Sequence, residues 1–135
     1  MEDKAQSNLE IARRYLALLE RDVTAPELRA LFSPDFTHRE FPNRLNPQGR
    51  TMTRPELEAA TLKAAELLVE QTYSIRHAIT AGDEVALEVD WRGSFKVPFG
   101  KTPAGTPLSA SFGMFLTFRD GRIASQRNYD CFEPF

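Results

Sequence analysis

The chain has 135 residues, with 17 Lys and Arg against 19 Asp and Glu, a formal net charge of -2. This length suits a single domain, residues 1–135, with a real hydrophobic core, and the near-neutral charge disfavours nucleic acid and anionic membranes as partners. The single cysteine excludes an internal disulfide and a cysteine-rich zinc site. The polar N-terminus has no apolar leader, and no apolar run is long enough to span a bilayer, so we expect a cytoplasmic protein.

Helical patterns occur in the first half of the chain. Apolar residues at helical spacing predict an amphipathic helix over residues 4–21. Residues 24–27 (TAPE) have capping-box spacing with proline in the first turn, and they predict a second, short helix that Pro34 ends. A second capping box at residues 53–56 (TRPE) opens a third helix, which we expect to continue to about Val69.

The rest of the sequence is typical of strands. Strands are predicted over residues 35–41, 73–81, 85–95, 108–118 and 122–132. Asp120-Gly121 lies between the last two of these and suits positive φ in a tight turn, so it predicts a long closing hairpin. Residues 42–49 and 96–107 are rich in turn formers and are expected to be surface loops.

This order of elements predicts the fold class. Three helices that precede most of the strands indicate an α+β domain with the helices packed on one face of a mostly antiparallel sheet. A strongly curved sheet wrapped over helices forms a cone, and such a cone leaves a ligand-sized hollow into which polar side chains converge. The candidates for function are therefore the polar side chains that face this hollow.

Three segments carry a resemblance to a known family: Arg14–Leu19 (RYLALL), Leu31–Asp35 (LFSPD) and Arg119–Ile123 (RDGRI). With the order of elements, they resemble the SnoaL-like branch of the nuclear transport factor 2-like superfamily, which has a cystatin-like fold. That group contains ketosteroid isomerases, polyketide cyclases, limonene epoxide hydrolase and many uncharacterised proteins. The resemblance covers nearly the whole chain, and its motifs mark the fold far more than the reaction.

The resemblance to ketosteroid isomerase implies roles for two residues. Tyr15 takes the place of the tyrosine that donates to a developing oxyanion, and Glu40 takes the place of the general base. Period two places His38 and Phe36 on the same side as Glu40. The alternatives are structural: a Tyr15 ring in the core, a satisfied His38, and a Glu40 that pairs with one of the arginines at positions 39, 44 and 50.

Two departures from the family patterns weaken the enzyme hypothesis. Met114 stands where ketosteroid isomerase has its second oxyanion donor, and a thioether donates no hydrogen bond. Asn128 stands where polyketide cyclases carry an acid/base aspartate, and asparagine is not a base. Asp130 has the same parity as Asn128 and Gln126 on the last strand, so it is the residue that can substitute.

The strand over residues 85–95 leaves two orientations open. Either Glu88 and Asp90 face the hollow, or the apolar side does and Trp91 forms part of its wall. In the first orientation the apolar side would lie against a second subunit. We favour an apolar side that is at least partly a dimer interface, because an exposed apolar stripe needs a partner. Limonene epoxide hydrolase, another member of the resembled group, uses an Asp-Arg-Asp arrangement. The same residue types occur here as Asp90, Arg92, Arg127 and Asp130, but the sequence does not show whether they come together in that arrangement.

These observations give one site and two functional hypotheses. The predicted catalytic residues are Tyr15, His38, Glu40 and Asp130, and the predicted ligand-binding residues are Phe36, Asp90, Trp91, Met114, Gln126 and Asn128. The first hypothesis is a cofactor-free isomerase, cyclase or lyase that acts on a small hydrophobic carbonyl compound, and the second is a non-catalytic ligand-binding or accessory domain. We expect a homodimer through the sheet, and no metal because the only two histidines lie far apart in sequence.

Overall fold

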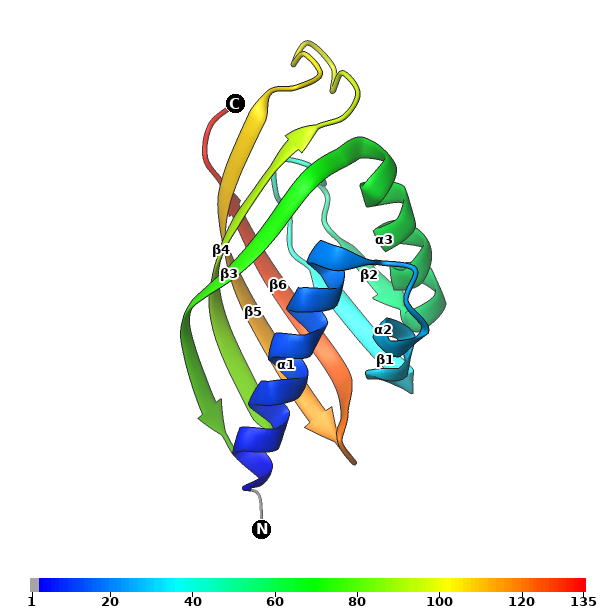
Figure 1. The fold of residues 1–135 in the computed structure, drawn as a ribbon, viewed down its shortest axis with the longest axis vertical. Helices are drawn as coiled ribbons and strands as arrows, with labels where there is room; N and C mark the ends of the chain where they lie inside the picture. Colours follow the sequence, from blue (N-terminus) through cyan, green and yellow to red (C-terminus); the bar gives the residue numbers. More distant parts are fainter. Residues whose placement is uncertain (1–2) are drawn as a thin grey trace.

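The computed structural model describes residues 3–135 and has the α+β fold that the sequence predicts. Three helices accompany one six-stranded sheet of strand order β2-β1-β6-β5-β4-β3, as Figure 1 shows. The helices are α1 (Lys4–Arg21), α2 (Pro26–Ala30) and α3 (Arg54–Leu67). The strands are β1 (Phe32–Glu40), β2 (Arg50–Thr53), β3 (Leu68–Ala81), β4 (Glu84–Phe95), β5 (Pro107–Arg119) and β6 (Arg122–Phe132).

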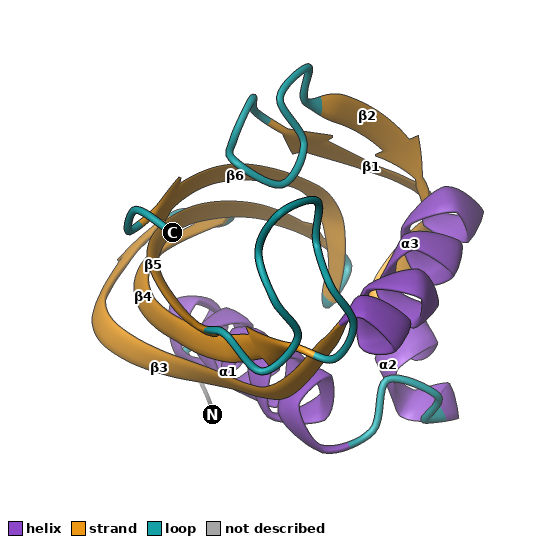
Figure 2. Cartoon of the chain, turned by 90° about the horizontal axis from the view of Figure 1, so that it is seen from above, coloured by secondary structure: helices purple, strands orange, loops and turns teal. Residues whose placement is uncertain are grey.

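The sheet is mostly antiparallel and strongly curved. Only β1 and β6 run parallel, and every other neighbouring pair is antiparallel. Viewed from above, the strands curl into an incomplete ring, with α1 against its inner side and α3 beside its open side (Figure 2). None of the helices within residues 3–135 has the length and apolarity needed to cross a membrane.

Local sequence signals account for the element ends that were predicted. The capping box of α3 is present, with the Thr53 hydroxyl donating to the Glu56 carboxylate at 2.9 Å and the Thr53 amide donating to it at 3.0 Å. Asp120 and Gly121 both have positive φ, 53° and 73°, at the turn between β5 and β6. The helix start and the closing hairpin are therefore confirmed.

Two predicted boundaries are wrong, and one strand was not predicted. Strand β1 already begins at Phe32, so Pro34 does not end a helix but lies within a strand, at a shift in the register between β1 and β6 where its missing N–H is tolerated. Strand β2 has only four residues, directly after the loop predicted over residues 42–49, and no strand was predicted there. Strand β3 begins at Leu68 and not near residue 72, because a bulge that places Glu70 at φ 56° joins its first residues to the regular part.

The inner side of β4 settles the orientation that the sequence left open. Val85, Leu87, Val89 and Trp91 are at most 3% exposed and belong to the main core cluster. The expectation that this apolar stripe forms a dimer interface is therefore wrong, because α1 and the neighbouring strands already cover it. The packed core fills the half of the cone beneath α1, and the half that faces α3 is hollow.

Candidate functional site

A cavity of about 720 Å³ opens between α3 and the inner face of the sheet. Trp91, Phe112 and Met114 form part of its apolar wall on the sheet side. The α3 side of the cavity is formed mainly by small and apolar residues at helical spacing, with the charged Lys63 and Glu66 beside them: Leu57, Ala60, Thr61, Ala64 and Leu67. No residue of α3 is fully buried, because its apolar face looks into the cavity and not into packed core. The predicted chamber is present, and its size suits a small organic ligand.

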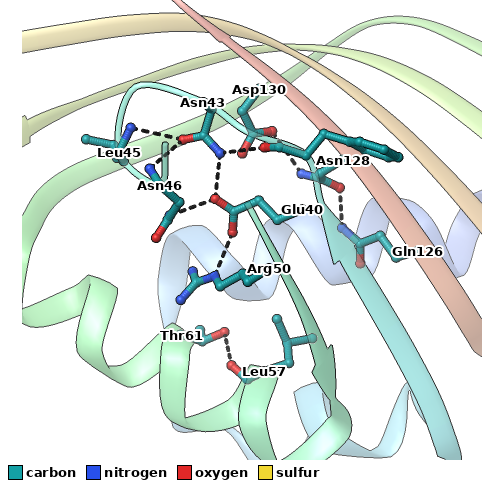
Figure 3. Close-up of polar contacts among 11 residues, drawn as sticks. Glu40, Asn43, Leu45, Asn46, Arg50, Leu57, Thr61, Gln126, Asn128 and Asp130 are labelled. Carbon is teal, nitrogen blue, oxygen red and sulfur yellow. Dashed lines mark hydrogen bonds and ion pairs between the residues drawn. The ribbon is translucent and has the colours of Figure 1, made fainter. Parts of the chain in front are cut away.

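A chain of hydrogen bonds runs along the inner face of β6. The Tyr15 hydroxyl donates to Gln126 Oε1 at 3.0 Å, and Gln126 Nε2 donates to Asn128 Oδ1 at 2.7 Å. Asn128 Nδ2 then donates to Asp130 Oδ1 at 3.1 Å, and Figure 3 shows how these three β6 side chains follow one another. The period of the strand places them on one side, and each buried amide gains a partner. The chain ends at the Asp130 carboxylate.

The pKa of Asp130 is strongly shifted. Burial raises its pKa to about 7, and the nearby Glu40 carboxylate adds to the rise, while the hydrogen bond from Asn128 and the charge of Arg50 oppose it. Only one hydrogen bond reaches the carboxylate from residues 3–135, and that bond is made at Oδ1. A carboxyl group with these properties can both accept and return a proton at neutral pH.

Glu40 is held by three donors at the end of β1. Asn43 Nδ2 and Asn46 Nδ2 each donate to Oε2 at 2.7 Å, and Arg50 Nε donates to Oε1 at 2.9 Å. Asn43 Oδ1 also accepts the backbone N–H groups of Leu45 and Asn46, so the same residue shapes the loop after β1 (Figure 3). The ion pair exists because β2 pairs with β1 and sets Arg50 directly opposite Glu40. Both oxygens of Glu40 are occupied.

His38 lies deeper on the same side of β1 and is 5% exposed. It pairs in register with Gln126 across the parallel β1–β6 ladder, and its Nδ1 has no hydrogen-bond partner within residues 3–135. Burial lowers the pKa of His38 to about 4, so the ring is neutral at pH 7. Among residues 3–135, no three His, Cys, Asp or Glu side chains lie close enough together to bind one metal ion.

A second polar group of the cavity was missed by the sequence analysis. The Tyr73 hydroxyl donates to Gln71 Oε1 at 3.1 Å, and Trp91 Nε1 donates to the same oxygen at 3.2 Å. All three residues line the cavity, and burial raises the pKa of Tyr73. The bulge after Val69 brings Gln71 to this position, and no pattern in the sequence marks that bulge.

Two of the predicted ligand-binding residues lie elsewhere. Phe36 does not line the cavity but packs in the core, with ring centroids 4.6 Å from Phe32 and 6.3 Å from His38. Asp90 lies on the outer face of the sheet, where it pairs with Arg76. Both expectations are wrong because the alternation of side chains along a strand separates its two faces but does not show which face, or which residues of that face, line the cavity. The remaining predicted site residues all line the cavity, namely Tyr15, His38, Glu40, Trp91, Met114, Gln126, Asn128 and Asp130.

Comparisons with known proteins identify a family and several structures of similar fold. The family model of the SnoaL-like domain matches residues 12–126. A search of curated proteins gave no match.

Several solved structures share the fold. IdmH of Streptomyces antibioticus, a proposed polyketide cyclase, is 21% identical, with 91% of each chain covered and a TM-score of 0.77. AclR of Streptomyces galilaeus, a proposed hydroxylase, is 16% identical, with 94% of this chain and 76% of that chain covered and a TM-score of 0.78. A Catenulispora acidiphila protein of ketosteroid isomerase-like fold, solved with trimethylamine, is 24% identical, with coverages of 89% and 84% and a TM-score of 0.73.

Proposed function

We propose, from the premise that the chain belongs to the SnoaL-like domain family, that its cavity binds a small hydrophobic carbonyl compound and moves a proton on it without a cofactor. Isomerases, cyclases and lyases share this kind of acid–base step. The observation that carries the proposal is the Asp130 carboxylate, which lies in the cavity wall with a pKa of about 7 and a single hydrogen bond.

The proposed step is proton transfer from carbon to Asp130. The carboxylate removes a proton from the carbon next to the carbonyl, and the electron pair of that C–H bond moves into the carbonyl to form an enolate. Asp130 then returns the proton to another carbon of the conjugated enolate. Alternatively, the enolate carbon attacks a second carbonyl carbon of the same molecule, the π electrons of that carbonyl move to its oxygen, and this oxygen takes the proton from Asp130. The bond from Asn128 fixes Oδ1, so Oδ2 is the oxygen that takes the proton.

The other polar residues of the site have separate roles in this proposal. Tyr15 donates its hydroxyl hydrogen to Gln126, so we assign it to the positioning of Asn128 and Asp130 and not to the oxyanion. Glu40 already accepts three hydrogen bonds, so we assign it to holding Arg50 and the loop after β1. Arg50 uses only Nε in that pair, which leaves its terminal nitrogens for the enolate oxygen.

Deuterium exchange tests the proposal without knowledge of the natural substrate. The probe is 2-tetralone, a hydrophobic ketone with acidic C–H bonds, and NMR follows the loss of its α-proton signals in D₂O. We expect the protein to accelerate the exchange and Asp130→Asn to reduce that acceleration by about 10²- to 10⁴-fold. Asp90→Asn is the matched control, because it makes the same change on the outer face. Equal rates in the wild type and Asp130→Asn would reject Asp130 as the base.

A non-catalytic ligand-binding domain is the second candidate. Met114 and Asn128 favour it, since they line the cavity where relatives are expected to carry acids, and they hold no proton to transfer. This candidate predicts that 2-tetralone binds, as seen by fluorescence of Trp91, while its exchange stays at the rate of the buffer. The same sample thus distinguishes the two functions.

We also propose that two copies of the chain pair through the outer face of the sheet. An aromatic patch lies there, made of Phe41, Phe115 and Tyr129: Phe41 stacks on Tyr129 at 4.4 Å between ring centroids, and Phe115 meets Tyr129 at 5.7 Å. Phe115 and Tyr129 are 38% and 44% exposed, and arginine guanidinium groups lie over the Phe41 and Phe115 rings. A patch that offers both rings and cations can pair with its own copy across a two-fold axis.

Sedimentation tests this pairing. We expect a dimer for the wild type and a monomer for Tyr129→Asp, which places a charge in the aromatic patch. Leu62→Asp on α3 is the control, since Leu62 is also an exposed apolar residue, at 47%, but belongs to a helix and not to the sheet face that carries the patch. A monomeric wild type at micromolar concentration would reject the pairing.

A further inference from the structure

An aromatic wall stands around Asp130. Tyr73, Trp91, Phe112 and Phe132 all line the cavity, and Phe112 is the residue of β5 that pairs in register with Asp130. The ring of Phe112 lies 5.5 Å from Trp91, 5.9 Å from Phe132 and 6.3 Å from Tyr73, measured between centroids. Four rings from four strands and one carboxylate thus share one side of the cavity.

The charges of the cavity do not balance. Its lining contains three acids, Glu40, Glu66 and Asp130, and two bases, Arg50 and Lys63. Arg50 is already paired with Glu40, and within residues 3–135 no lysine, arginine or histidine lies within ion-pair distance of Asp130. When Asp130 is ionised, its charge therefore lies half-buried beside aromatic rings, and the nearby cation, Arg50, is not in contact with it but is paired with Glu40.

Both features favour the same ligand chemistry. The faces of tryptophan, phenylalanine and tyrosine carry negative potential and attract cations, most strongly where water is excluded. A neutral hydrophobic ligand would gain nothing from the carboxylate, and an anionic ligand would be repelled by it. A ligand with a positive charge gains from both the rings and Asp130.

We propose that the compound taken by this cavity carries a positively charged nitrogen, an ammonium group on a hydrophobic body, which lies against the aromatic wall beside Asp130. This inference rests on the proposed function: it keeps the same site and reaction and adds that the substrate is positively charged. A cationic group near the carbonyl also makes the neighbouring C–H bond more acidic, so the charge that aids binding also aids the proton transfer.

A pair of ligands of equal shape isolates the charge. Phenyltrimethylammonium and tert-butylbenzene differ in one central atom and its charge, and neither can donate a hydrogen bond from that end. Binding is followed through the fluorescence of Trp91, which is the only tryptophan of the chain and lies in the aromatic wall. We expect the wild-type protein to bind the ammonium ligand at least tenfold more tightly than the neutral one.

Two variants separate the sources of that preference. Asp130→Asn removes the charge and keeps the shape, and we expect it to reduce the preference about tenfold. Phe112→Leu keeps the charge and removes one ring, and we expect a reduction of about threefold. Circular dichroism confirms that each variant is folded.

Each outcome is decisive. Equal affinities in the wild type, no binding of the ammonium ligand, or a preference that both variants retain would overturn the inference. Because 2-tetralone is neutral, its exchange reports on Asp130 as a base regardless of this result. Exchange without an ammonium preference would reject the charge class alone, and an ammonium preference without exchange would reject the catalysis alone.

Discussion

Strands β4 and β6 belong to one sheet and follow the same period, yet their inner faces differ in chemistry. The inner face of β4 consists of Val85, Leu87, Val89 and Trp91, which are buried against other apolar groups. The inner face of β6 continues from Ile123 to the polar residues Gln126, Asn128 and Asp130. Burial alone therefore does not distinguish the strand that stabilises the fold from the strand that carries the site. Buried polar groups need partners, and β6 supplies them in one continuous chain.

The largest expected effect is on the β4 side of this comparison. Leu87→Ala removes methyl and methylene groups from packed core, 3% exposed, and we expect a loss of about 2–5 kcal/mol in the free energy of unfolding. Urea denaturation followed by Trp91 fluorescence measures it. Ile79→Ala on the neighbouring strand is the control, since Ile79 is 57% exposed, and its cost is expected to stay below about 1 kcal/mol. Similar costs for the two variants would mean that β4 is not the packed side.

On β6, a substitution should reduce stability by removing hydrogen-bond partners and not by removing side-chain volume. Gln126→Leu keeps the approximate size but leaves the Tyr15 hydroxyl and Asn128 Oδ1 without their partner, so we expect a cost of about 1–3 kcal/mol. Adding Tyr15→Phe to that variant removes one of the two unpaired groups and should recover part of the loss. If the double variant is no more stable than the single one, the hydrogen-bond chain does not stabilise the strand.

Two titratable groups of the cavity, His38 and Asp130, should give opposite pH dependence. His38 has its pKa lowered from 6.5 to about 4, so its contribution to stability is present above pH 6.5 and is lost as the pH falls toward 4. Asp130 has its pKa raised from 3.8 to about 7, so its contribution is present below pH 3.8 and is lost as the pH rises through 7. In the wild-type protein the two trends offset one another between pH 4 and 7.

Single variants expose each trend. Asp130→Asn should leave a stability that rises with pH from 4 to 6.5, by up to about 3 kcal/mol, and it should be more stable than the wild type at pH 8. His38→Gln should leave a stability that falls as the pH rises from 4 to 7. Thermal unfolding in a series of buffers measures both. A wild-type profile shared by both variants would show that neither group is buried as the structure places it.

The predictable part of the site follows from local rules. The parity of Gln126, Asn128 and Asp130, like the turn at Asp120-Gly121, depends only on neighbours in sequence, and both were predicted. Three arginines were candidates for the partner of Glu40, and the structure selects Arg50 because β2 pairs with β1. This pairing was not predicted, because β2 has only four residues and shows no clear strand pattern in the sequence. The sequence left open which side of β4 faces inward, because the alternating pattern fits either orientation. Only the position of α1 in the fold shows which side is covered.

The smallest expected effect tests that last correction. Asp90 and Asp130 are both strand aspartates, and they were both expected at the site, but the structure places Asp90 on the outer face in an exposed pair with Arg76. Asp90→Asn removes only this pair, so we expect a change below about 1 kcal/mol in the free energy of unfolding, no pH trend of its own, and unchanged ligand affinity. The same substitution at position 130 should alter all three quantities. If Asp90→Asn weakened the binding of 2-tetralone, the polar side of β4 would have to face the ligand, and the contrast between the two strands would be lost.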